Sequence, residues 1–130
     1  MKSIITILLI LILPLTVYLV MTSKSDTAKV NAQGNNLPTM KVYTSTMCLD
    51  CQKMKGVVKE IEPEYKNKIN IISINALDNR KSVQDEIKKY GIVLVPTIIY
   101  INSDGTIKNK TEGYIPKEEL IKEIESTING

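Results

Sequence analysis

Cys48-Leu49-Asp50-Cys51 is the stretch that decides the fold, and it contains both cysteines of the 130-residue chain. A short apolar run begins at Met40 and ends just before it. The residues after it repeat apolar side chains at helical spacing, namely Met54, Val57, Val58 and Ile61. The start of a helix has unpaired backbone N–H groups and a partial positive charge, which favour a thiolate over a thiol. Because the thiolate is the nucleophile, this order of strand, cysteine pair and helix predicts a reactive sulfur.

The composition argues against several classes of function. The chain has 17 basic and 14 acidic residues, and a net charge of +3 is too small to indicate nucleic-acid binding. Histidine is absent, so the usual general base and the commonest metal ligand are missing. Zinc needs four ligands, and two thiols in one chain do not supply them. We therefore expect no metal, no organic cofactor and no nucleic-acid partner.

Residues 1–23 are predicted to be a signal-anchor or transmembrane segment. The run from residue 4 to residue 21 is almost wholly apolar, and crossing a bilayer takes about 20 such residues. A cleaved signal peptide would have a shorter apolar core of roughly 7–15 residues. An uncleaved single-pass anchor in the cytoplasmic membrane is therefore favoured over a secreted protein. Both alternatives place residues 24–130 outside the cytoplasm.

Residues 24–39 are predicted to be a flexible polar linker. They include Gly34 and Pro38 and show no sustained hydrophobic period. A short preliminary strand within this stretch is the alternative. The folded domain is then expected to span residues 40–130.

Within that domain the pattern alternates between strands and helices. The first half predicts a strand over 40–44, a helix from the cysteines to about Glu62 before Pro63, and a strand over 69–74 covered on both faces. A second helix should be capped by Asp78 or Asn79 and should end at Gly91.

The second half begins with the apolar run 92–101, which predicts a strand interrupted by Pro96. Proline donates no ladder hydrogen bond, so Pro96 should lie at the beginning of that strand. A hairpin turn over 103–106 and a weaker edge strand over 106–111 follow, and Pro116 should occupy the first turn of the last helix. The resulting order, β-α-β-α-β-β-α, predicts an α/β sandwich.

This order resembles the thioredoxin family across residues 40–128. A CxxC pair alone is a weak signal, but here a Val-Pro-Thr follows in a βαβ context. The stretches that carry the resemblance are Cys48-Leu49-Asp50-Cys51, Tyr90-Gly91-Ile92, Val95-Pro96-Thr97, Asp104-Gly105, Gly113 and 117–120. The resemblance implies a three-layer sandwich whose mixed four-stranded sheet has the order 2-1-3-4. The first two strands would be parallel and the last two antiparallel.

The resemblance also implies roles for individual residues. Cys48 would attack a substrate disulfide and Cys51 would resolve the mixed disulfide. Pro96 would follow a cis peptide bond and face the cysteines, while the backbone of Val95 pairs with an extended substrate segment. Two neighbours of these groups, Thr97 and Met47, complete the expected substrate-binding set.

Several positions depart from the thioredoxin pattern. Met47 replaces the usual tryptophan, and Leu49-Asp50 replaces Gly-Pro between the cysteines, where it should tune the redox potential. Val42 stands where thioredoxins have a buried acid, and Gly56 stands where they have a helix-kinking proline. The first strand and helix of the full-length fold are missing or reduced to the linker, so the chain resembles a trimmed member.

These features predict a membrane-tethered, extracytoplasmic thiol–disulfide oxidoreductase. A purely structural disulfide is a weak alternative, because closing so small a loop contributes roughly 2 kcal/mol against about 3 for a 15-residue loop. Asp50 places a negative charge beside Cys48 and works against its thiolate, which favours a reductant over an oxidant. The expected partners are exported proteins with disulfides and a membrane electron donor, and we expect a monomer.

Two other functions compete with this prediction. A redox-inactive adaptor would keep the fold and bind peptides beside Pro96. A glutathione-dependent, glutaredoxin-type enzyme is disfavoured, because the Gly-Gly pair usual in that family is absent and only Gly113 is present.

Overall fold

The fold is built on a mixed sheet whose four strands lie in the order β2-β1-β3-β4. The computed structural model describes residues 36–130, so the predicted membrane segment and residues 24–35 of the predicted linker lie outside the described residues. In the described part, no helix has the length and apolar character needed to cross a membrane. The elements are β1 (Thr39–Thr44), α2 (Leu49–Tyr65), β2 (Asn70–Asn75), α3 (Lys81–Lys89), β3 (Thr97–Ile101), β4 (Ile107–Glu112) and α4 (Lys117–Asn129).

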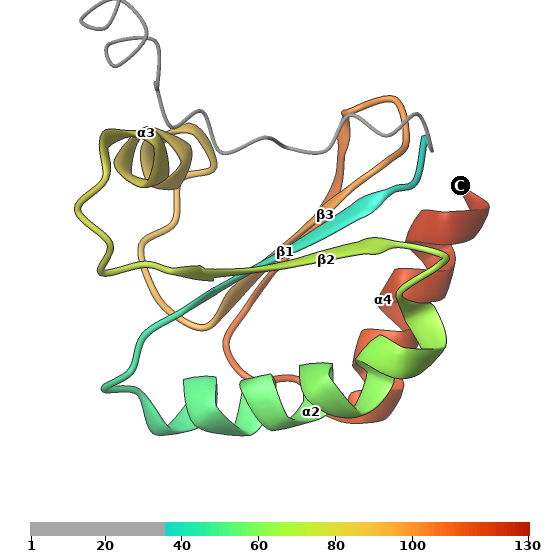
Figure 1. Cartoon of the computed structure of the whole chain (residues 1–130), viewed down its shortest axis with the longest axis horizontal. Coiled ribbons are helices and arrows are strands. Elements are labelled where there is room, and N and C mark those ends of the chain that lie inside the picture. Colours follow the sequence, from blue (N-terminus) through green and yellow to red (C-terminus); the bar gives the residue numbers. More distant parts are fainter. Residues whose placement is uncertain (1–35) are drawn as a thin grey trace, which may run out of the picture. The chain divides into compact units, whose positions relative to one another are not determined.

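The topology confirms the predicted element order and strand order. β1 pairs with β2 in parallel and with β3 in antiparallel fashion, and β3 pairs with β4 in antiparallel fashion. Figure 1 shows α2 and α4 on one face of the sheet and α3 on the other. The helices and the sheet therefore form the three layers of an α/β sandwich.

The main core lies between the sheet and the pair α2 and α4. Alternate residues of β1 point into it, because successive side chains of a strand face opposite sides of the sheet. The buried residues of this cluster are Met40, Val42, Met54, Val58, Ile61, Tyr65, Ile69, Ile98, Tyr100, Ile115, Leu120 and Ile124. These aliphatic, methionine and tyrosine side chains form the core without phenylalanine or tryptophan, as the composition predicts.

The face covered by α3 is held by polar contacts. The Lys41 ammonium lies 2.7 Å from one carboxylate oxygen of Glu86, and the Tyr43 hydroxyl donates a hydrogen bond of 2.7 Å to the other. Burial by itself would raise the pKa of Glu86, but the hydrogen bonds from Lys41 and Tyr43 outweigh it and lower that pKa. Val83 is the one buried residue of α3. This layer is more polar than the main core.

The predicted end of the first helix is wrong, because α2 continues through Pro63 to Tyr65. Figure 1 shows α2 bending near its C-terminal end. Proline removes one helical hydrogen bond, but this loss is offset by packing in the last turn. Tyr65 is buried there, and its hydroxyl donates a hydrogen bond of 3.1 Å to Glu125 of α4.

The prediction that the second strand is covered on both faces is also wrong. β2 forms an edge of the sheet, and Ile72 on it is 38% exposed. A run of isoleucines looks the same in an edge strand and in a central one, so the sequence pattern could not separate them.

Two further boundaries differ from the prediction. The residue before α3 is Arg80, with no side-chain cap, and Asp78 instead accepts the Arg80 backbone N–H at 2.9 Å in the preceding turn. The last helix begins at Lys117, so Pro116 is its N-cap residue and lies just outside the first turn. Gly91 follows α3 with a φ of 58°, a conformation that suits glycine, as predicted for the end of that helix.

The predicted strand over 92–101 is shortened to Thr97–Ile101. Pro96 directly precedes β3, which confirms that it lies at the beginning of the strand. Residues 92–95 form a loop instead, and Val93 within it is 84% exposed. This loop lies beside the cysteines, because the Val95 carbonyl accepts a hydrogen bond from the Cys48 thiol.

Candidate active site

Cys48 is the N-cap residue of α2, at the point where the chain leaves β1 and turns into the helix. Its backbone is extended, with φ −110° and ψ 122°, and its sulfur accepts the backbone N–H of Cys51 at 3.1 Å. The short loop before it is fixed by the Ser45 hydroxyl, which accepts the Met47 backbone N–H at 3.2 Å. Cys48 is partly exposed. The Cys48 sulfur therefore lies at the helix start, where it accepts one of the backbone N–H groups that have no partner within the helix.

Cys51 lies one helical turn further on and has no exposed surface. Its sulfur accepts the backbone N–H of Ser45 at 3.4 Å. Burial raises the pKa of the Cys51 thiol, and its hydrogen bond with Cys48 adds to that rise. Both cysteines are free thiols in this structure. The two sulfurs therefore differ in their access to solvent, although they share one helix end.

The loop before β3 brings its backbone to the cysteines. The peptide bond between Val95 and Pro96 is cis, as the resemblance implied. The Cys48 thiol lies 3.7 Å from the Val95 carbonyl oxygen, to which it donates. On the far side of the loop, the Pro96 carbonyl accepts the Gly113 backbone N–H at 2.8 Å. The structure thus brings Cys48, Cys51, Val95 and Pro96 together from segments about 45 residues apart.

The other residues predicted for the site lie around this centre. Met47 and Leu49 flank Cys48 and are 89% and 82% exposed. Asp50 is also exposed, and its carboxylate lies 3.1 Å from the Lys53 ammonium. Thr97 is fully buried, and its hydroxyl donates to the Leu94 carbonyl at 2.7 Å. The Thr97 side chain therefore supports the loop from behind and does not reach the surface.

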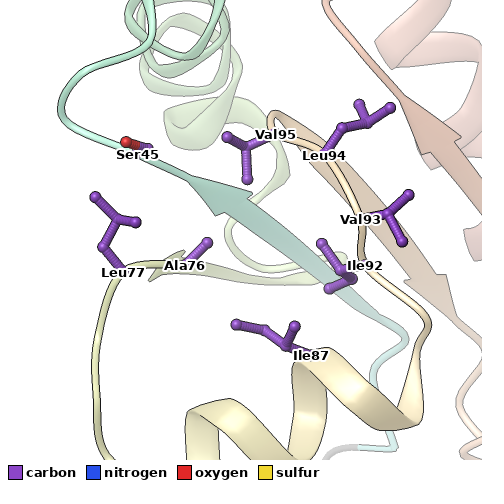
Figure 2. A pocket seen from close by; sticks show the side chains of 8 residues that line it. All are labelled: Ser45, Ala76, Leu77, Ile87, Ile92, Val93, Leu94 and Val95. Carbon is purple, nitrogen blue, oxygen red and sulfur yellow. The ribbon is translucent and has the colours of Figure 1, made fainter.

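A pocket beside the cysteines contains residues that the sequence analysis did not select. Its volume is about 220 Å³, and Figure 2 shows side chains from four parts of the chain around it. The lining residues are Ser45, Ala76, Leu77, Ile87, Ile92, Val93, Leu94 and Val95. Leu77 and Val93 are exposed, so this pocket and its rim are apolar and open to solvent. The sequence marks this pocket only by the apolar run before Pro96, whose pattern predicts a strand and not an exposed loop.

The site can carry out thiol chemistry with its own side chains. A partly exposed sulfur, a buried second sulfur within one turn, and a nearby open backbone segment are the parts that disulfide exchange requires. In residues 36–130, no group of three or more Cys, Asp or Glu side chains is placed to hold a metal ion.

Comparison with known proteins points to the same chemistry. The thioredoxin-like domain family matches residues 25–128. The chain is 26% identical over 99 residues to the thioredoxin-like protein HCF164 of Arabidopsis thaliana, covering 76% of this chain. It is 23% identical over 97 residues to the thiol:disulfide interchange protein TxlA of Synechococcus elongatus, covering 75% of this chain.

These two relatives are longer than the matched region. The match spans 37% of the length of the Arabidopsis protein and 50% of the length of the Synechococcus protein. A crystal structure of chloroplastic thioredoxin z superposes with a TM-score of 0.62, at 18% identity, covering 74% of this chain and 82% of that one. At that level of identity, the superposition supports the fold alone.

Proposed function

Because this chain belongs to the thioredoxin-like family of thiol–disulfide oxidoreductases, we propose that it exchanges disulfides with protein substrates through Cys48 and Cys51. The observation that carries the proposal is the contrast between the two sulfurs. Cys48 is partly exposed at the start of α2 and accepts a backbone hydrogen bond, while Cys51 is buried behind it. Cys48 is the nucleophile in this proposal, and Cys51 is the resolving thiol.

The reaction needs two exchanges. The Cys48 thiolate attacks one sulfur of a substrate disulfide, the substrate S–S bond breaks, and the released substrate thiolate takes a proton from water. Cys51 then loses its proton and attacks the Cys48 sulfur, so that a Cys48–Cys51 disulfide forms and the second substrate thiolate leaves. The substrate gains two electrons and the protein loses two. A dithiol donor must reduce the protein again before the next cycle.

Substrate binding is proposed for the surface around these sulfurs. An extended segment can pair with the backbone at Val95, next to Cys48. Met47 supplies exposed apolar surface on one side of Cys48, and the pocket of Figure 2 supplies it on the other. Pro96 and Thr97 hold the loop in place from behind. An apolar side chain beside the substrate cysteine fits this surface better than a charged one.

We propose that the protein works as a reductant. Asp50 lies in the first turn of α2, two residues after Cys48, and its negative charge opposes the Cys48 thiolate. A less stabilised thiolate makes the reduced protein a stronger electron donor. Lys53 pairs with Asp50 and reduces the size of this effect.

We also propose that residues 4–21 anchor the chain in the cytoplasmic membrane and that the domain faces outward. The basis is the apolar N-terminal run with its short basic head. In this setting the substrates are exported proteins, and the dithiol donor is a membrane protein that carries electrons across. A membrane-impermeant maleimide tests the orientation: it should label Cys48 in intact cells and after lysis equally, whereas labelling only after lysis would contradict it.

The activity is tested by insulin reduction with dithiothreitol, using the full chain in detergent. The wild type should accelerate precipitation of the insulin B chain, and Cys48→Ser should not. A wild type as inactive as Cys48→Ser would contradict the enzymatic function and favour the peptide-binding adaptor. The Cys51→Ala variant then identifies the substrate, because the partner should remain covalently attached to Cys48 in the native membrane.

A further inference from the structure

In the resolving step, the Cys51 thiol must lose its proton before its sulfur can attack Cys48. The thiol is fully buried, and burial raises its pKa, so the attacking thiolate is scarce at neutral pH. The strand that faces α2 offers no acid to accept the proton. The residue there is Val42, which is buried in the main core.

Lys55 lies where a charge can act on Cys51. The two residues are four apart in α2, so they lie on the same face of the helix. Val58 continues that face and is buried against the sheet, where it lines a cavity of about 300 Å³ together with Val42 and Lys55. Lys55 is half-buried. None of the ion pairs formed within residues 36–130 involves it, although its neighbour Lys53 is paired.

The other charged groups near this cavity are further from the sulfur. At about 1.5 Å of rise per residue, Lys55 lies ~6 Å along the helix from Cys51, Lys59 ~12 Å and Glu62 ~16 Å. β1 and β2 add only Val42 and Ser73 to the cavity wall. In the reduced protein, Cys48 is the other titratable group next to Cys51, and its effect opposes the Cys51 thiolate. In the mixed disulfide Cys48 carries no charge. Lys55 is therefore the positive group placed to favour that thiolate.

We propose that the Lys55 ammonium stabilises the Cys51 thiolate during the resolving step, in a helix whose facing strand supplies no acid. This inference rests on the proposed function. The proton of Cys51 passes to water, the Cys51 sulfur forms its bond with Cys48, and the substrate thiolate leaves. Lys55 neither donates nor accepts a proton in this step. It is a positioning residue that acts through Cys51 and touches no substrate.

A biphasic reaction separates the two steps. When reduced full-length protein in detergent reacts with excess 5,5′-dithiobis(2-nitrobenzoate), attack by Cys48 releases one coloured thiolate. Resolution by Cys51 releases a second, and Cys51→Ala should lack this phase. We expect Lys55→Met to slow the second phase roughly 3- to 10-fold at neutral pH, as for one charge at this distance in a medium of intermediate polarity. Its rate-against-pH profile should shift to higher pH, and the first phase should stay within about twofold of wild type.

Three further variants complete the test. Lys55→Gln should behave like Lys55→Met. Agreement between these two variants would show that the effect comes from the lost charge and not from a folding defect in one of them. Lys55→Arg keeps the charge and should restore most of the rate. Lys59→Met removes a lysine from the same cavity two turns from Cys51, and it should leave both phases unchanged.

Two results would overturn the inference. If Lys55→Met and Lys55→Gln kept the wild-type second phase and its pH profile, while the first phase was normal, Lys55 would have no role and the proposed function would stand. If wild-type Cys48 failed to release the first thiolate, the proposed function would fall, and this inference with it.

Discussion

The surroundings of the two cysteines differ more than their separation of one helical turn suggests. Cys48 lies on an exposed rim with Met47 and Leu49, where side chains make few contacts. Cys51 lies in a packed layer between α2 and the sheet, close in sequence to the fully buried Met54. The rim supplies access and the packed layer supplies a fixed geometry. A single helix end can therefore present one sulfur to solvent and bury the other.

The largest effects on activity are expected when each sulfur is removed in turn. Cys48→Ser should abolish insulin reduction, because no nucleophile remains at the surface. Cys51→Ala should also stop turnover but should retain the first attack, so covalent complexes accumulate. Non-reducing electrophoresis measures how much mixed disulfide each variant forms with its substrates. Equal accumulation of covalent complexes in the two variants would contradict the assigned roles.

Truncating a side chain in the packed layer should lower the stability of the protein much more than truncating one on the exposed rim. Met54→Ala leaves a cavity in the main core and should lower the free energy of unfolding by about 2–5 kcal/mol. Leu49→Ala removes an exposed side chain and should change it by less than about 0.5 kcal/mol. Urea denaturation of both variants measures the two values. Similar losses in both would mean that the rim is packed in solution.

The raised pKa of Cys51 makes the stability of the reduced protein depend on pH. A group whose pKa is raised by folding contributes stability below its unfolded pKa, and this stability is lost as the pH rises through the folded value. The ordinary thiol value here is 9.0, so the loss should begin near that pH. Denaturation of the reduced wild type above pH 9, compared with Cys51→Ala, should show the extra alkaline loss in the wild type alone. Parallel curves would contradict the burial effect.

The smallest effect is expected from the charge beside Cys48. Asp50→Asn removes a negative charge and should raise the reduction potential by roughly 5–20 mV, since the group is exposed and already paired. Lys53→Met should shift the potential the other way, because it leaves Asp50 unpaired. Equilibration with glutathione buffers measures both. A wild-type potential near that of strong oxidants, or no rise in Asp50→Asn, would contradict the proposed direction.

The sequence predicted the parts of the fold that rest on periodicity and on strong local signals. The spacing of Met54, Val58 and Ile61 identified the buried face of α2, and the order of elements predicted the α/β sandwich. The strand order of the sheet came from the resemblance to the thioredoxin family. It did not distinguish an edge strand from a covered one at Ile72, since exposure depends on which strands lie alongside. The end of α2 was missed because packing of Tyr65 against α4 outweighs the effect of Pro63.

The sequence likewise predicted some residues of the site and missed others. The cysteine pair and Pro96 carry local signals, and the structure brings them together. Leu77 and Val93 were missed, because nothing local marks an exposed apolar residue in a loop. Thr97 was selected through its neighbour Pro96, but the structure places its side chain behind the loop. The exposure of these side chains depends on contacts between distant segments, which the hydrophobic periodicity of the sequence does not reveal.

The different roles of the two sulfurs are measured most directly by the alkylation rate of each cysteine in the freshly reduced full-length protein at neutral pH. Iodoacetamide labelling followed by peptide mass spectrometry gives the two rates separately, with a denatured sample as the reference. We expect Cys48 to react faster than the unfolded reference and Cys51 to stay almost unlabelled. Labelling of Cys48 no faster than the unfolded chain, or equal labelling of both cysteines, would contradict these roles.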